Sequence, residues 1–153
     1  MTRSKRGGNI VAVCLGVLVL LAGYAASAQP AGPSVSHSAL VETSSVAPGQ
    51  TFRAAVTFSV DKPWHVNARH PLDEFLIPTL VNFPEDGPFR VLRAAYPEAV
   101  MMTLSFSPEP LALYEGTFAV GIEAEAPADL APGTHTLKGM LQYQACNDKM
   151  CAP

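Results

Sequence analysis

Proline is spread through most of this 153-residue chain and constrains its fold more than any other feature. All fourteen prolines lie between positions 30 and 153, so the uninterrupted stretches between them are short. Inside a helix, proline removes a hydrogen-bond donor and clashes with the preceding turn. We therefore expect short strands and loops after residue 29, and no long helix.

The first 28 residues have the three parts of a secretory signal. A basic stretch, MTRSKRGG, precedes an uncharged apolar run over about residues 10–22, and Ala26-Ser27-Ala28 supplies an A-x-A cleavage motif. The apolar run is shorter than the ~20 residues that a membrane span needs, which favours a cleaved signal over an uncleaved anchor. We predict that residues 1–28 are a cleaved signal peptide, that 29–37 form a linker and that 38–153 form one domain.

The exported part is acidic and holds two cysteines. Loss of the three basic residues of the signal leaves seven Lys and Arg against thirteen Asp and Glu, a formal charge of −6. This charge argues against nucleic acid or an anionic membrane surface as a partner. Cys14 leaves with the signal. Beyond the inner membrane, the remaining pair, Cys146 and Cys151, can form a disulfide that persists.

The exported part reads as a series of short strands. Residues 51–60, TFRAAVTFSV, alternate between apolar and polar positions, which is typical of a half-buried strand. The run 96–113 lacks such a period and holds three prolines, so we expect an irregular, functional segment there. Short strands separated by turns favour an all-β fold, an antiparallel β-sandwich. The expected strands are 38–43, 51–60, 64–69, 79–83, 89–95, 114–123 and 134–146.

The two exported cysteines are five positions apart at the end of the last expected strand. A four-residue connection lets Cys146 and Cys151 face each other across a hairpin, where a disulfide can form. A disulfide that closes a loop of six residues stabilises a fold by only about 2 kcal/mol on the chain-entropy model. This placement favours thiol–disulfide exchange at an exposed disulfide. The C-x-x-x-x-C spacing alone does not separate exchange from an inert local disulfide.

Five short motifs are spread over nearly all of the exported part. Through these motifs, the chain resembles the N-terminal periplasmic domains of the thiol:disulfide interchange protein DsbD. The YQAC motif with Cys151 is the most specific of the five. The motifs are Trp64-His65-Val66-Asn67, residues 71–79, Tyr96-Pro97, Leu113-Tyr114-Glu115-Gly116, and Tyr143-Gln144-Ala145-Cys146 with Cys151.

The resemblance implies an immunoglobulin-like antiparallel β-sandwich in the periplasm that works as a protein-disulfide reductase domain. Its cysteine pair would take electrons from a thioredoxin-like domain and pass them to oxidised periplasmic proteins, such as cytochrome c maturation factors. A membrane-embedded domain of the full-length protein would supply the electrons. Because the chain ends two residues after Cys151, we expect that it is a fragment, truncated at its C-terminus and attached to the inner membrane as part of a longer protein.

The resemblance also implies roles for single residues. Cys151 would form the mixed disulfide with partners, and Cys146 would resolve it. The run 98–113 matches a flexible cap loop, with Phe106 as the shielding aromatic residue. His65, Asn67 and Tyr143 are expected to support the cysteines, and no metal or other cofactor is expected.

Two other classes of function stay open at this point. A copper-binding module would combine Cys146 and Cys151 with His65, His70 or the Met101-Met102 pair, because sulfur ligands suit Cu(I). A structural sandwich with an inert disulfide is the second alternative.

Overall fold

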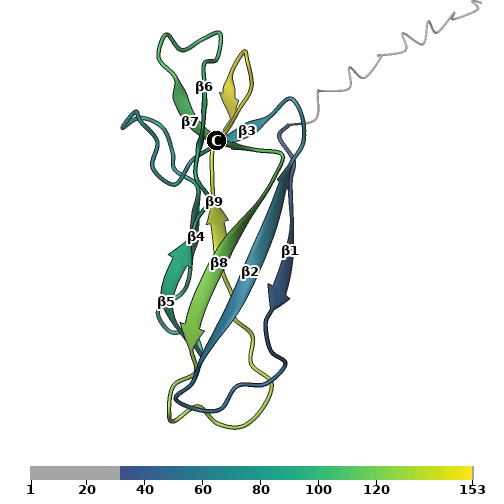
Figure 1. Ribbon diagram of the computed structural model, residues 1–153, viewed down its shortest axis with the longest axis vertical. Coiled ribbons are helices and arrows are strands. Elements are labelled where there is room, and N and C mark those ends of the chain that lie inside the picture. The colour runs from purple at the N-terminus through teal and green to yellow at the C-terminus, as the bar shows by residue number, and fades with distance from the viewer. Residues whose placement is uncertain (1–31, 153) are drawn as a thin grey trace, which may run out of the picture. The chain divides into compact units, whose positions relative to one another are not determined.

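The computed structural model describes residues 32–152, which form eleven strands and no helix. Every strand pair in this part is antiparallel, and the strands form three sheets (Figure 1). The first sheet has the order β1 (Val35–Val41), β2 (Thr51–Val60), β8 (Thr117–Glu125) and β5 (Arg90–Ala95). The second sheet has the order β11 (Cys151–Ala152), β10 (Ala145–Cys146), β3 (His65–Asn67), β7 (Leu111–Glu115) and β6 (Val100–Met102). The third pairs β4 (Leu80–Asn82) with β9 (Met140–Gln142).

The core lies between the first and second sheets, as expected for a β-sandwich. Strand β8 alternates between exposed and buried positions, because successive side chains of a strand point to opposite faces. Its Phe118 lies against Phe58 of β2 and Tyr114 of β7, with ring centroids 5.4 Å and 4.9 Å away. The buried residues of this cluster are Phe58, Val60, Val66, Ala68, Ala112, Tyr114, Phe118, Val120 and Ala145. The predicted all-β sandwich is confirmed.

Strand β2 begins and ends at the predicted residues, but several other strands do not. The expected strand 114–123 is two strands, because Gly116 adopts a left-handed φ of 58° and turns the chain from the second sheet into the first. The expected irregular run 96–113 contains β6 and the first residues of β7, so its irregular part is narrower. Strand β1 begins at Val35, inside the expected linker.

The prediction of one continuous strand over residues 134–146 is wrong for the first half of that range. Strand β9 has only three residues, and its partner β4 is equally short because Pro78 and Pro84 flank it. The pairing partner then changes from β4 to β3, and the strand breaks between β9 and β10. This break brings the last hairpin to the end of the sandwich where β3, β6 and β7 lie (Figure 1).

The second sheet is covered on both faces, and this arrangement creates the site. Its inner face packs on the first sheet, whereas its outer face carries Leu111, Leu113 and Cys146. Two loops cover this outer face. One joins β3 to β4 and contributes Leu76; the other joins β6 to β7, residues 103–110, and contributes Leu104. We call residues 103–110 the cap segment.

The predicted signal peptide lies outside the described residues. Within residues 32–152, no helix is long and apolar enough to cross a membrane.

The turn at Gly116 gives a test of the fold. Replacement of Gly116 by Ala should lower the free energy of unfolding by about 1 kcal/mol, since only the backbone conformation resists the added Cβ, which meets no atom within 4 Å. Gly121→Ala is the matched control, because its Cβ would make an ordinary 3.9 Å contact in β8. Urea unfolding should show no loss for Gly121→Ala; equal losses for the two variants would contradict this account of the turn.

Candidate redox site at the end of the sandwich

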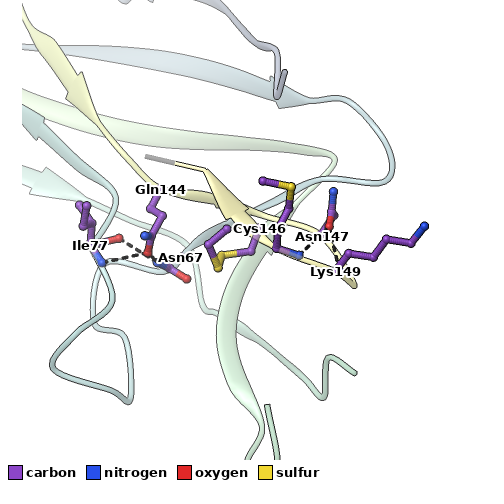
Figure 2. The surroundings of a disulfide bond; sticks show 8 residues. Asn67, Ile77, Gln144, Cys146, Asn147 and Lys149 are labelled. Carbon is purple, nitrogen blue, oxygen red and sulfur yellow. Dashed lines mark hydrogen bonds between the residues drawn. A yellow bond between two sulfur atoms is a disulfide. The ribbon is translucent and has the colours of Figure 1, made fainter. Parts of the chain in front are cut away.

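Cys146 and Cys151 form a disulfide between two adjacent strands. The two residues are direct partners in the β10–β11 register, with their Cα atoms 3.9 Å apart and their sulfurs bonded at 2.05 Å. This short separation is typical of a pair whose two residues do not exchange backbone hydrogen bonds. The predicted hairpin and its disulfide are confirmed, and Figure 2 shows the pair with its neighbours.

The side chain of Asn147 holds the turn of this hairpin. Its Oδ1 accepts hydrogen bonds from the backbone N–H groups of Lys149 and Met150, at 2.8 Å and 3.0 Å (Figure 2). The backbone N–H of Asn147 also donates to the carbonyl of Met150 at 2.9 Å. Asparagine commonly stabilises turns in this way. The hairpin therefore keeps the two cysteines paired through local contacts.

The two cysteines differ in their access to solvent. Cys146 is fully buried at 0% exposure, whereas Cys151 on the edge strand is partly exposed. The expectation of an exposed disulfide is therefore wrong for Cys146. The reason is the position of β10, which has β11 on one side, β3 on the other, and the two covering loops over its outer face. Within residues 32–152, the accessible cysteine of the pair is therefore Cys151.

The cap segment packs over the disulfide through an aliphatic residue. Leu104 is 2% exposed and belongs to the same apolar cluster as Cys146, against which Met102 and Cys151 also pack. The hydroxyl of Ser105 donates to the carbonyl of Asp148 in the hairpin turn, which ties the cap segment to the cysteine hairpin. Phe106 is 42% exposed, so Leu104 supplies the buried contact and the role of Phe106 stays a prediction.

The register of the second sheet places the cysteines in a row with two ionisable residues. Across β11, β10, β3 and β7, the successive partners are Cys151, Cys146, His65 and Glu115. Direct partners in antiparallel strands point to the same face of a sheet. His65 is buried at 7% exposure, and its desolvation lowers its pKa below the ordinary value, while the nearby carboxylates of Asp148 and Glu115 act in the opposite direction.

Asn67 links the site to the loop between β3 and β4. Its Nδ2 donates to the carbonyl of Ile77 at 3.0 Å and to Oε1 of Gln144 at 2.9 Å, and the same Oε1 accepts the backbone N–H of Ile77 at 3.3 Å (Figure 2). Gln144 lies two residues before Cys146 in the break between β9 and β10. This network fixes the break and with it the position of Cys146.

The remaining predicted residues, Tyr143, His70 and Met101, do not belong to the apolar cluster that contains Cys146. Tyr143 packs against the core cluster on the inner side of the second sheet, so any support that it gives to the cysteines passes through the core. His70 and Met101 are exposed. Within residues 32–152, no group of three or more His, Cys, Asp or Glu side chains is placed to hold a metal ion.

A scan against protein families matches residues 36–153 to the family described as thiol:disulfide interchange protein DsbD, N-terminal. The chain belongs to this family. Searches of curated proteins and of solved structures gave no match. Membership in the DsbD N-terminal family identifies the sandwich as immunoglobulin-like. It also supports a role for the Cys146–Cys151 disulfide in thiol–disulfide exchange between this domain and other redox proteins. The family consists of periplasmic domains.

Sequence reasoning missed several residues that surround the disulfide in this DsbD-type domain. Leu104 and Leu76 lie in segments without a strand or helix period, so nothing in their pattern predicts burial. Gln144 is a polar residue in an expected strand, and only the break of that strand explains its contacts. Leu113 lies at the end of the expected irregular run, whereas the structure shows it as a fully buried strand residue in the same apolar cluster as Cys146.

A pair of substitutions in the cap segment tests which residue covers the disulfide. Leu104→Ala should lower the free energy of unfolding by roughly 2–4 kcal/mol, because it removes a buried aliphatic side chain. It should also speed reduction of the disulfide by dithiothreitol, since the cover over Cys146 becomes thinner.

Phe106→Ala is the matched control for stability, because Phe106 is far more exposed. Its unfolding free energy should change by less than about 1 kcal/mol. Denaturant unfolding and the loss of the disulfide over time measure the two effects. If Phe106→Ala destabilises the domain more than Leu104→Ala, our assignment of the buried contact is wrong.

Proposed function

We propose that this domain is a periplasmic thiol–disulfide exchange module. It passes reducing equivalents from a thioredoxin-like donor domain to oxidised periplasmic proteins through Cys146 and Cys151. The observation that carries the proposal is the one-sided access to the disulfide, which joins a buried Cys146 to a partly exposed Cys151 in a chain of the DsbD N-terminal family.

The difference in exposure supports separate roles for the two cysteines. A donor thiolate attacks the accessible Cys151 sulfur, the disulfide breaks, and Cys146 leaves as the thiolate. The second thiol of the donor then attacks the mixed disulfide and releases the reduced pair. In the next half of the cycle, the Cys151 thiolate attacks a disulfide of an oxidised protein, and Cys146 displaces that protein from the mixed disulfide. Two electrons pass in each half.

The cap segment supports a shielding role for the loop between β6 and β7. Leu104 covers Cys146, and Ser105 ties the loop to the turn that carries Asp148. A cover of this kind slows reaction with small oxidants and thiols, whereas a protein partner can displace it on docking. We propose that Phe106, at the exposed edge of the same loop, contributes to this shield.

The weak contribution of the disulfide to stability supports exchange over a structural role. It closes a loop of six residues, which gives about 2 kcal/mol on the chain-entropy model. The large cluster between the two sheets holds the fold without it. The pair can therefore cycle between its two redox states while the sandwich stays folded.

The location of the domain follows from its family and from its expected leader. We propose that residues 1–28 direct export and are then removed, and that the domain works in the periplasm beside a membrane-embedded domain of a longer protein. That domain would bring electrons to the thioredoxin-like donor. The acidic charge of the exported part agrees with protein partners and not with nucleic acid.

Trapping of a mixed disulfide tests the roles of the two cysteines. With Cys146→Ser, the reduced domain should form a stable mixed disulfide through Cys151 with a thioredoxin-like protein whose second cysteine is replaced and whose first cysteine is already joined to thionitrobenzoate. The Cys151 thiolate attacks that mixed disulfide, and thionitrobenzoate leaves as the thiolate. The reverse variant, Cys151→Ser, should give little adduct, because Cys146 is buried. Non-reducing electrophoresis and peptide mass mapping identify the bonded cysteine. Adducts formed mainly through Cys146 would contradict the assignment.

A further inference from the structure

Two buried polar atoms beside the disulfide have no hydrogen-bond partner within the described part of the chain. They are Nε2 of His65 and Oδ1 of Asn67, on side chains that are 7% and 0% exposed. Buried polar atoms without partners are uncommon, because each costs the free energy of its lost hydration. Asn67 uses its Nδ2 in the contacts described above. Within the described residues, Nε2 of His65 makes no hydrogen bond that would give it a structural use, and its position beside Cys146 in the register suggests a chemical one.

The sheet register brings His65 close to the buried cysteine. Cys146 pairs with Cys151 on one side and with His65 on the other. In an antiparallel sheet the two kinds of pair alternate, so partners on the His65 side have Cα atoms about 5.5 Å apart and side chains on one face. The imidazole of His65 therefore lies on the same face of the sheet as the Cys146 side chain, one strand away.

The exchange cycle needs a proton acceptor at this place. Cys146 must be a thiolate to attack a mixed disulfide on Cys151, but a fully buried thiol has no water to take its proton. The amide of Asn67 is not a base. The carboxylates of Asp148 and Glu115 belong to exposed residues, whereas His65 is buried as Cys146 is.

We propose that His65 is the proton acceptor of Cys146 in the step that releases the reduced partner, an inference that rests on the proposed exchange function. Nε2 of His65 takes the thiol proton as the Cys146 sulfur attacks the sulfur of Cys151. The bond between Cys151 and the partner breaks, and the partner leaves with the electron pair as a thiolate. That thiolate takes a proton from the imidazolium or from water, which restores neutral His65.

The charged groups around His65 set the pH at which it can act. Burial favours the neutral ring, which has a free lone pair to accept the proton, and thus lowers the pKa. Asp148 from the hairpin turn and Glu115 from β7 raise it in part, and Cys146 is the titratable group opposite in β10. The release step should therefore be slow below the pKa of His65, where the ring is already protonated, and faster above it.

The wild-type protein gives the first test. The reduced domain is mixed with excess oxidised glutathione, samples are quenched in acid, and mass spectrometry follows the glutathione adduct and its conversion to the internal disulfide. We expect the conversion rate to rise with pH and level off, with a midpoint equal to the pKa of His65 measured by NMR in the same reduced protein. A rate without this midpoint would overturn the proposal.

Substitutions give the second test. His65→Gln should slow the conversion roughly 100-fold at pH 7, which is the lower end of the usual gain from general-base catalysis. It should approach the wild-type rate at high pH, where the thiol ionises unaided; a merely structural defect would not recover in this way. His37→Gln, in the edge strand β1 of the other sheet, is the matched control and should leave the profile unchanged.

Glu115→Gln tests the effect of a neighbouring charge on the pKa of His65 and leaves the imidazole in place. Because the carboxylate raises the pKa of His65, its loss should move the midpoint to lower pH and make the conversion faster than in wild type at pH 5. Because Glu115 is exposed, we expect this variant to fold, and it can test the proposal even if His65→Gln does not fold. An unchanged or higher midpoint would contradict the proposal.

A domain without exchange activity and a domain whose His65 is not the proton acceptor give different results. If wild-type protein never forms a glutathione adduct or an internal disulfide at any pH, the exchange function fails and the role of His65 fails with it. If exchange occurs and His65→Gln follows the wild-type pH profile, only the role of His65 is wrong.

Discussion

The register between β3, β10 and β11 decides what surrounds the disulfide. In this register Cys146 faces Cys151 on one side and His65 on the other, while Ala145 points into the core of the sandwich. Because side chains alternate along a strand, a slip by one residue would bury Cys146 between the sheets and bring Ala145 to the outer face. The network of Asn67, Gln144 and Ile77 opposes such a slip, since it fixes the chain two residues before Cys146.

The two faces of the second sheet separate stability from chemistry. The inner face packs aromatic and aliphatic residues against the first sheet, and this cluster holds the fold. The outer face has a smaller cluster in which Leu104 and Leu113 enclose the buried cysteine. A change of redox state therefore acts on the small cluster, beside a loop that one hydroxyl contact ties to the hairpin. We therefore expect the core of the sandwich to stay packed when the disulfide is reduced.

Sequence patterns predicted the parts of this structure that depend on local order. Alternation predicted β2 to the residue, and the cysteine spacing predicted the hairpin and its facing sulfurs. Patterns failed where tertiary contacts decide the outcome. Gly116 breaks an apparently continuous strand, β9 is only as long as its proline-flanked partner allows, and Leu104 is buried by a cluster assembled from four segments. The row from Cys151 to Glu115 depends on pairing between distant strands, which one sequence does not reveal.

The central claim is that the Cys146–Cys151 pair carries electrons and adds little to the stability of the fold. Its equilibrium reduction potential, measured against a series of glutathione or dithiothreitol buffers, tests this claim most directly. An exchange pair should have a potential of about −270 to −180 mV, where thioredoxin-like proteins and disulfide isomerases work. A potential well below about −300 mV would identify an inert structural disulfide and contradict the account.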